Sequence, residues 1–184
     1  MKLNLGCGRD VRKGYINIDV CNPWELDVVI HDLNKMPYPF EDNTFDEVYA
    51  SHIIEHLNDF HQTIMEIHRI CKPNAKIIVK APFFPSTKFF GDPSHRIPFS
   101  YRTFDNYAVV EGRVPFYEKW KLNQRTNFGA DGNFRILKRK FIFSNFTVIK
   151  WIGWFINIAP MYYERFFCFM LPAEELYYEL EVLK

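Results

Sequence analysis

Short apolar segments alternate with tight turns and one helix-like stretch in the first 80 residues, and this order limits the folds open to the chain. Segments 2–6, 15–19, 26–30, 45–50 and 75–80 each have the length of a strand. Between residues 52 and 71 the apolar positions instead recur at three- and four-residue steps, as on one face of a helix. Strands with few polar interruptions that alternate with helix predict an α/β fold, with a mostly parallel sheet covered on both faces.

The second half of the chain is less regular. Residues 81–133 hold most of the remaining prolines and glycines, and 134–143 has the pattern of a strand. Segment 145–170 predicts an aromatic-rich helix broken near Pro160, and 175–183 predicts a last strand. A length of 184 residues suits one domain, 1–184, whose core is large enough to need no covalent staple.

Composition excludes several classes of protein. Hydrophobic residues make up 48% and charged residues 24%, which excludes disorder, collagen-like repeats and coiled coil. The four cysteines form no close pair, so neither a zinc ribbon nor a disulfide framework is expected. No apolar run reaches the ~20 residues of a membrane span, and the first strand begins near residue 2. We therefore expect a soluble, cytoplasmic protein without a transmembrane segment.

A glycine turn and two carboxylates follow three successive predicted strands. Gly6 and Gly8 close the first strand, Asp19 ends the second and Asp32 follows the third. Ligands of open parallel sheets bind outside the carboxyl ends of the strands, so these groups predict a nucleoside site in which Asp19 accepts ribose hydroxyls. The alternative is that both carboxylates only cap loops. A dinucleotide site is disfavoured because the turn lacks a third glycine.

Taken in order, these motifs carry a family resemblance. The chain resembles class I S-adenosylmethionine-dependent methyltransferases of the Leu-Gly-Cys-Gly and Glu-His-Leu type. The resemblance lies in Leu3-Asn-Leu-Gly-Cys-Gly8, Asp19, His31-Asp-Leu33, the segment 45–57 ending in Glu-His-Leu, and 70–79. The resemblance implies a Rossmann-like sheet, mostly parallel with an antiparallel last strand, and S-adenosylmethionine as cofactor. Residues 1–80 would then be the cofactor half and 81–184 the acceptor half. The helices after the first two strands are shortened, because almost no sequence is left to form them.

The same resemblance implies roles for individual residues. The glycine motif would pass under the amino-acid part of the cofactor, Asp19 would hold the ribose, and Asp32 with Leu33 would lie beside the adenine. Two positions depart from the family pattern, because Asn4 replaces the usual acidic residue and Asp10 the third glycine. The predicted cofactor-binding residues are Asn4, Gly6, Cys7, Gly8, Asp19, Asp32, Leu33, Ser51 and His52, the last two bordering the methionine moiety.

Four of the six histidines lie between residues 52 and 68. His52-Ile-Ile-Glu55-His56 matches the H-x-x-E-H pattern of zinc proteases, whose histidines share one helix face. The motif nevertheless follows a strand in the methyltransferase order. We therefore expect no metal, and assign Glu55 and His56 to orienting the start of the helix, with His56 on the substrate side.

The loop after the fifth strand is the candidate acceptor site. Asp92, His95 and Arg96 lie within one turn of it. Methyl transfer needs an aligned acceptor that is deprotonated when necessary, so we assign His95 as base, Asp92 as its orienting partner and Arg96 as an anion contact. The alternative is a loop-stabilising bond between His95 and Asp92.

Charge is unevenly distributed along a chain whose net charge is only +1. Residues 1–60 carry −6, residues 61–150 carry +10 and residues 151–184 carry −3. The basic middle, with the run Lys138-Arg139-Lys140, favours an anionic acceptor, although a charge run is more often a solvated face. DNA is excluded as a substrate because the Pro-Pro-aromatic motif of amino-methylating enzymes is absent after the fourth strand.

The sequence thus predicts methyl transfer to a small-molecule or glycan-like, anionic acceptor. A non-catalytic nucleoside-binding or scaffold module of the same fold and an RNA methyltransferase are the alternatives. Aromatic residues make up 18% of the chain and gather in segment 145–170. An excess there predicts a homodimer face, a lid over an apolar acceptor or an interfacial membrane contact.

Overall fold

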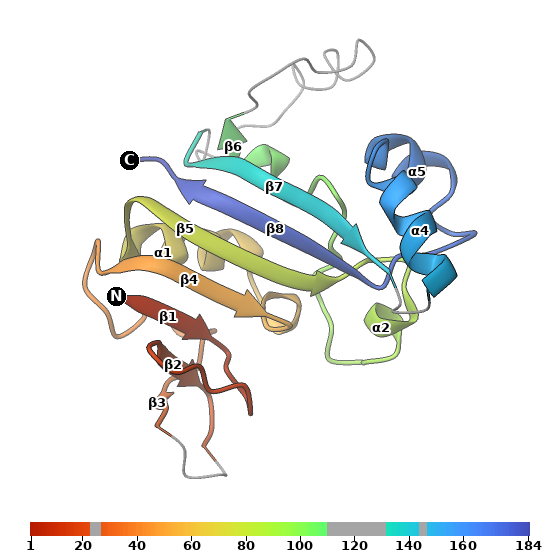
Figure 1. The fold of residues 1–184 in the computed structure, drawn as a ribbon. Helices are drawn as coiled ribbons and strands as arrows, with labels where there is room; N and C mark the ends of the chain where they lie inside the picture. The colour runs from red at the N-terminus through yellow and green to blue at the C-terminus, as the bar shows by residue number, and fades with distance from the viewer. Residues whose placement is uncertain (23–26, 110–131, 144–146) are drawn as a thin grey trace.

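The strands of the chain form one mixed sheet in the computed structural model, which describes residues 1–22, 27–109, 132–143 and 147–184. The sheet has eight strands in the order β3-β2-β1-β4-β5-β8-β7-β6 (Figure 1). Strands β1 to β5 pair in parallel, whereas β8 is antiparallel to both β5 and β7, and β6 is parallel to β7. The predicted mostly parallel sheet with an antiparallel last strand is confirmed. Its strands are β1 (Lys2–Leu5), β2 (Ile16–Asp19), β3 (Val29–Ile30), β4 (Phe45–Ser51), β5 (Cys71–Pro82), β6 (Ala108–Val109), β7 (Phe134–Ile142) and β8 (Glu175–Val182).

The helix predicted for 52–71 begins later than the periodicity indicated. The chain first forms a 3-10 turn, η1 (Ile54–His56), and then becomes extended at Leu57. Helix α1 (Phe60–Ile70) begins where the Asp59 side chain accepts a hydrogen bond from Gln62 N at 2.9 Å. This N-cap supplies one of the acceptors that the first turn of a helix lacks, and therefore sets where α1 starts.

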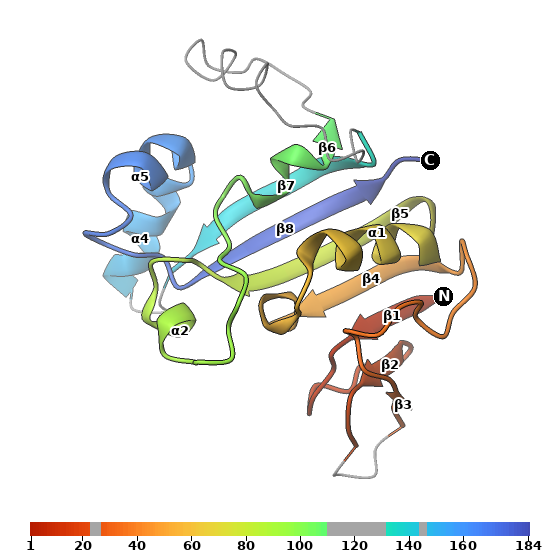
Figure 2. The same cartoon turned by 180° about the vertical axis from the view of Figure 1, so that it is seen from behind.

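The sheet is covered by helix on one face only, among the described residues. Helix α1 lies behind β4 and β5 in Figure 1 and in front of them in Figure 2. Described residues 6–15 contain no helix between β1 and β2, as the short connection predicted, and none of the described helices covers the face seen in Figure 1. For the described residues, the expectation of a sheet covered on both faces is therefore wrong.

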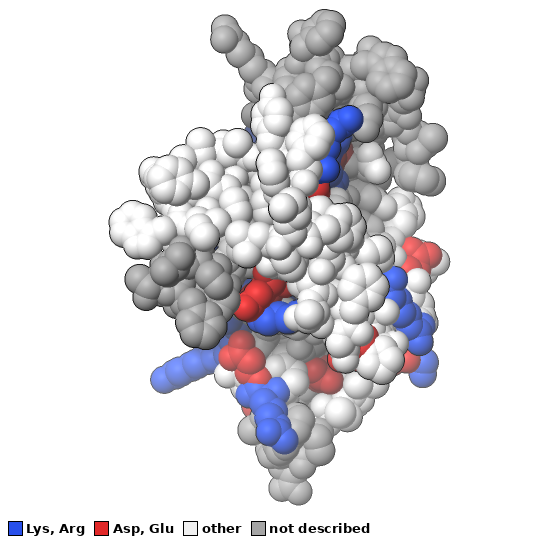
Figure 3. Space-filling view, turned by 90° about the vertical axis from the view of Figure 1, so that its right-hand side faces the viewer, with Lys and Arg blue, Asp and Glu red and all other residues white. Residues whose placement is uncertain are grey.

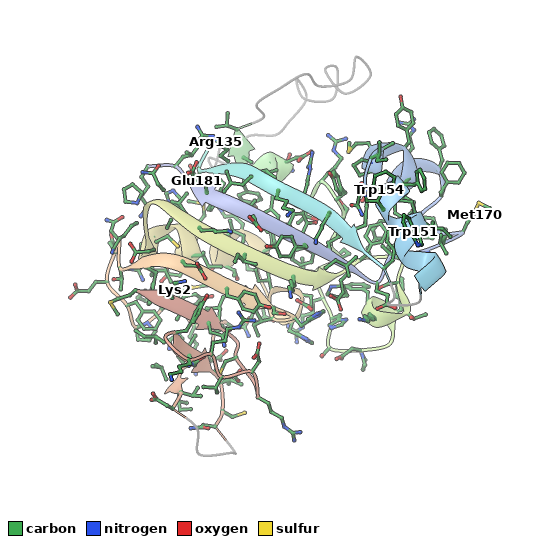
Figure 4. All side chains as sticks on the ribbon, in the orientation of Figure 1. Lys2, Arg135, Trp151, Trp154, Met170 and Glu181 are labelled. Carbon is green, nitrogen blue, oxygen red and sulfur yellow. The ribbon has the colours of Figure 1, made fainter. Side chains whose placement is uncertain are left out.

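Ion pairs occupy the open face instead. Lys2 pairs with Glu47 at 3.2 Å and Lys76 with Glu179 at 3.0 Å, each across neighbouring strands. Arg135 on β7 pairs with Glu181 on β8, as Figure 4 shows. Because side chains alternate between the two faces of a strand, these charged positions leave the apolar ones for the covered face.

Most of the remaining secondary structure lies at one end of the sheet. Helix α2 (Thr87–Phe90) follows β5, and η2 (Thr103–Asn106) precedes β6. The predicted aromatic helix is broken where expected, into α4 (Thr147–Ile156) and α5 (Pro160–Phe166), with Pro160 in the first turn of α5. Positions 145–146 of that prediction, and position 26 of the third strand, lie outside the described residues.

One core of buried residues runs from Leu3 to Val182 and joins both halves of the chain. Strand β5 carries Ile77, Val79 and Ala81 into it, and β8 carries Leu176, Tyr178 and Leu180. Strand β5 begins at Cys71 rather than at 75, because this buried residue already pairs with Phe45 of β4. A search of the described residues finds no helix with the length and apolarity needed to cross a bilayer.

Candidate functional site

The carboxyl ends of β1, β2 and β4 meet at one edge of the sheet. The strand order reverses direction between β1 and β4, which is the switch point where ligands of open α/β sheets bind. Gly6 has φ +62° and Gly8 φ +49°, so both are in the left-handed region that favours glycine. A Cβ at Gly6 would lie 2.3 Å from Cγ1 of Ile53, so this turn leaves no room for a side chain.

Asp19 holds the glycine turn in place. Its Oδ2 accepts a hydrogen bond from the backbone N–H of Gly8 at 2.7 Å, and its Oδ1 accepts one from Val20 N at 2.8 Å. The backbone N–H of Cys7 in turn donates to Ile18 O at 3.1 Å. A carboxylate has about four acceptor positions, so Asp19 keeps capacity for further donors.

Asn4 supports the turn through hydrogen bonds of its side-chain amide. It is buried, and its amide donates to Asp10 O at 2.7 Å and to Asn17 Oδ1 at 2.9 Å. Asn17 is also buried and accepts from Arg12 N at 2.9 Å. The register that pairs Asn4 with Asn17 brings the two amides together. Sequence analysis missed Asn17, although a polar residue at the centre of an apolar strand was the available signal.

The segment after β3 carries the second predicted carboxylate. Asp32 Oδ1 accepts from Asn34 N at 3.0 Å, and the side chain of Leu33 is buried in the core. Leu33 and Asn34 also line a hollow of about 150 Å³ with Asn58 and Gln62. Asp32 therefore shapes the turn that presents Leu33 beside this hollow.

His52 leaves the end of β4 with φ +54°. Its Nε2 lies 3.5 Å from Glu175 Oε1 and its Nδ1 lies 3.3 Å from Glu55 Oε1. These carboxylates, Glu175 first, raise the pKa of His52 to about 9, and the imidazolium in turn lowers the pKa of Glu175 to about 2. His52 is thus a cation near neutral pH. It does not share a helix face with His56, because residues 52–56 form a bend and the turn η1, so the protease-like spacing has no helical basis.

The predicted acceptor loop places His95 against aromatic neighbours. The ring of His95 stacks on Phe89 with 5.5 Å between centroids, and its Nδ1 is 2.8 Å from Phe89 O. Asp92 Oδ2 is 3.9 Å from His95 Nε2, beyond hydrogen-bond distance, while Asp92 Oδ1 accepts from Ser94 N and Oγ. The residue that orients His95 is therefore Phe89, through its carbonyl, in place of the predicted Asp92.

His56 and Arg96 join the 3-10 turn to this loop. The rings of His56 and His95 have centroids 4.5 Å apart, and His56 Nδ1 is 2.9 Å from Ser94 Oγ. The backbone N–H of Arg96 donates to Glu55 O at 2.7 Å, and its guanidinium donates to Asn58. The structure brings His56, His95 and Arg96 together as predicted, with Arg96 bonded to a neutral amide.

The residues at this edge of the sheet belong to a stretch that matches a known protein family. Residues 3–79, which contain the glycine turn, Asp19 and the end of β4, match a family described as methyltransferase domain. This stretch, 77 of the 184 residues of the chain, is similar to that family. The cofactor of this family is S-adenosylmethionine.

Two curated relatives each match less than half of the chain. Sterol 4-C-methyltransferase strm-1 of Caenorhabditis elegans is 40% identical over 52 residues, which is 28% of this chain and 15% of that protein. The 2-phytyl-1,4-naphtoquinone methyltransferase of Nostoc sp. strain PCC 7120 is 33% identical over 88 residues, or 48% of this chain and 34% of that protein. The chain thus covers about a third or less of the length of these two relatives.

The fold is similar to that of solved methyltransferase structures. An S-adenosylmethionine-dependent methyltransferase from Archaeoglobus fulgidus superposes with a TM-score of 0.54 at 18% identity, covering 98% of this chain and 85% of that one. At this identity the likeness concerns the fold alone, and it agrees with the predicted Rossmann-like, mostly parallel sheet.

Beyond the matched stretch, an aromatic surface extends from the same end of the sheet. We call this surface the aromatic end. Figure 3 shows it as a broad uncharged area, and Figure 4 shows Trp151, Trp154 and Met170 projecting outward. Its most exposed members are Trp151, Trp154, Phe155, Ile158, Phe169 and Met170, each at least 60% exposed.

A hollow of about 490 Å³ opens within the aromatic end. Its lining includes Ile156 of α4, Tyr162 of α5, and Phe167 and Leu171 of the segment that follows. The ring of Phe84, in the loop after β5, contacts that of Phe169 with 5.7 Å between centroids. The aromatic end therefore adjoins the loop after β5.

The basic middle of the chain is largely neutralised by acidic residues within the described structure. Lys88 lies 2.6 Å from Glu175 and 2.9 Å from Glu174, and Arg139 lies 2.5 Å from Asp105. Lys140 lies over the ring of Tyr177 at 5.3 Å. The remaining basic residues of the prediction, in segment 110–131, lie outside the described residues.

Proposed function

We propose that this chain transfers a methyl group from S-adenosylmethionine to a small acceptor with an apolar body. The observation that carries the methyl-transfer part is the Gly6–Gly8 turn tied to Asp19 at the switch point of the sheet. The same residues lie inside the stretch that matches the methyltransferase family.

The residues of this edge fit the cofactor. A Cβ at Gly8 would meet nothing within 4 Å, so the glycine leaves open space there in which a ligand can approach the backbone closely. We assign Gly6, Cys7 and Gly8 to the amino-acid part, Asp19 to the ribose, Asp32 and Leu33 to the adenine, and Ser51 and His52 to the border of the methionine moiety. Asn4 acts indirectly, because both protons of its amide are already donated to neighbours of the turn.

When bound, S-adenosylmethionine supplies a methyl group already activated on a sulfonium. The protein then has to hold the acceptor in line with the bond between sulfur and methyl carbon, and to keep water away. The glycine turn positions one partner of the reaction. The loop after β5 and the aromatic end are the adjoining surfaces that would position the other.

The aromatic end supports an acceptor with an apolar body. An exposed aromatic surface that surrounds an apolar hollow is the kind of site that takes an apolar ligand. The two curated relatives are named for a sterol and a phytyl naphthoquinone, both of which have large apolar bodies. The anionic or glycan-like acceptor predicted from charge has less support, because many of the described cations already have acidic partners.

Cofactor binding is tested by calorimetry with S-adenosylhomocysteine on the wild type, Asp19→Ala and the matched control Asp10→Ala. Asp10 lies in the same turn, but its side chain is exposed and pairs with Arg12 at 3.3 Å. Loss of hydrogen bonds to a charged group predicts binding about 10- to 100-fold weaker for Asp19→Ala, with little change for Asp10→Ala. Absence of binding to the wild type would refute the cofactor assignment.

Activity is tested by release of S-adenosylhomocysteine with a prenylated naphthoquinol, a sterol and a sugar phosphate as acceptors. Turnover with an apolar acceptor, and not with the sugar phosphate, is the expected result. Turnover with the sugar phosphate alone would instead support the anionic acceptor predicted from the charge of the sequence. Tight cofactor binding without turnover on any acceptor would favour the non-catalytic nucleoside-binding module, and salt-sensitive RNA binding abolished by reversing Lys138 and Lys140 would favour the RNA methyltransferase.

A further inference from the structure

Glu55 is a carboxylate buried in the turn η1. Its side chain is fully buried, and neither of its oxygens has a hydrogen-bond partner among the described residues. His52 is an ion-pair neighbour at 3.3 Å, which balances charge without satisfying the carboxylate by a hydrogen bond. A buried charged group with unfilled acceptor positions is costly, so its presence calls for a partner.

Two imidazoles lie next to this carboxylate, and each has one nitrogen already engaged. His95 Nδ1 lies 2.8 Å from a carbonyl oxygen, that of Phe89, so this nitrogen carries the proton. Ser94 Oγ donates its proton to Asp92 at 2.6 Å, and therefore accepts from His56 Nδ1 at 2.9 Å. No described residue forms a hydrogen bond with the Nε2 of either histidine, although Asp92 Oδ2 lies 3.9 Å from that of His95. In a neutral imidazole protonated on Nδ1, the lone pair is on Nε2.

This pattern is the one that metal-binding histidines show. A ligating imidazole donates its other N–H to a carbonyl or a carboxylate, which fixes the tautomer and directs the lone pair to the metal. Phe89 O plays that part for His95, and the Ser94–Asp92 pair plays it for His56. The loop after β5 is fixed next to η1 because Arg96 N and Ile97 N both donate to Glu55 O.

The three side chains converge closely enough to share one ion. Ligand atoms of Glu55, His56 and His95 all lie within 4.8 Å of one another. Ligands at about 2.0–2.2 Å from a common ion lie within about 4 Å of each other, so small side-chain rotations close the site. Two imidazoles and a carboxylate suit Zn²⁺ and neighbouring divalent transition metals, with a further position open.

The geometry points to a site for one divalent transition-metal ion formed by Glu55, His56 and His95. It differs from the zinc-protease pattern, because His52 faces Glu175 and the third ligand comes from the loop after β5. It also departs from the expectation of no metal drawn from the sequence. A metal-bound acceptor oxygen would be acidified there, which gives this site a direct use if the proposed methyl transfer holds.

The test uses metal binding alone, so that it does not depend on the proposed function. Chelator-treated full-length protein is titrated with Co²⁺, whose visible absorption reports coordination by nitrogen and carboxylate ligands, and then with Zn²⁺ by calorimetry. We expect one equivalent bound per chain. Binding should weaken by about 100-fold or more in His56→Gln and in His95→Gln, and by about 10-fold in Ser94→Ala, which removes an outer partner.

His61→Gln is the matched control, since His61 lies on α1 and contacts Tyr107 at 3.3 Å, outside the cluster. It should bind the ion as the wild type does. Circular dichroism and thermal unfolding establish that each variant is folded. Binding of less than about 0.1 equivalent to the wild type, or unchanged affinity in folded His56→Gln and His95→Gln, would overturn the site, whatever the outcome of the methyl-transfer assays.

Discussion

At the scale of single residues, the glycine turn depends on a contact far away in the sequence. Sequence reasoning identified Gly6 because no side chain should obstruct a ligand there. The structure adds that Ile53, 47 residues along the chain, already fills the space next to Gly6. The same position therefore has a structural reason to be glycine as well as a functional one.

Gly6→Ala should lower the free energy of unfolding by about 2–4 kcal/mol, because φ is +62° and the new Cβ overlaps Ile53. Gly14→Ala is the control, since Gly14 has φ +82° with nothing within 4 Å, and should lose only about 1–2 kcal/mol. Urea unfolding measures both. Partial rescue in Gly6→Ala combined with Ile53→Ala is expected, and its absence would contradict the contact as the cause.

At the scale of secondary-structure elements, α1 fixes the loop that carries Asp32 and Leu33. Glu66 on α1 accepts from Tyr38 N at 2.6 Å and from the guanidinium of Arg69 at 2.6 and 2.9 Å. Arg69 also donates to Phe40 O at 3.0 Å. The periodicity of the sequence located the apolar face of this helix. The hydrogen bonds that Glu66 accepts from Tyr38 and Arg69, which we call the polar clamp, join segments 28 residues apart and were not predictable from spacing.

Glu66→Gln should lower the free energy of unfolding by about 1–2 kcal/mol at pH 7, because the clamp loses its charge. Burial raises the pKa of Glu66, but hydrogen bonds from Arg69 and Tyr38 N outweigh it and hold the pKa below the usual 4.5. A lowered pKa gives stability above pH 4.5 that is lost as the pH falls below it, so the difference between wild type and variant should shrink in acid. Thermal unfolding at pH 7 and pH 3.5 checks this, with the exposed Glu41→Gln as control. A difference that stays constant with pH would argue against an ionic clamp.

At the scale of the whole molecule, charge and aromatic content have separate explanations. Basic residues of the middle segment pair with acidic residues of β8 across the open face of the sheet, so oppositely charged segments of the sequence partly neutralise each other in the fold. Part of the aromatic surplus fills the core, as in the contacts of Phe83 with Phe141 and of Phe104 with Tyr178. The rest forms the aromatic end, where it meets solvent.

The double variant Trp151→Ser and Trp154→Ser should raise the KM for an apolar acceptor by about 10-fold and leave S-adenosylhomocysteine affinity within about 2-fold, because it removes apolar contact area away from the glycine turn. Leu137→Ser, which changes an exposed apolar residue on β7, is the control and should leave KM unchanged. Sedimentation of the wild type and of both variants tests whether the aromatic end forms the predicted homodimer. A wild-type dimer that becomes monomeric in the double variant, with KM unchanged, would assign the aromatic end to self-association.

The sequence by itself determined the parallel half of the sheet, the turn at Gly6 and Gly8, and the carboxylate at the end of β2, because strand pattern and turn chemistry are local properties. It also indicated the break at Pro160, since proline cannot continue a helix. Only the tertiary structure decided which face of the sheet stays open, that Phe89 orients His95, and that Glu55 lies buried between two histidines. Those features depend on contacts between segments far apart in the chain, where no local pattern carries the information.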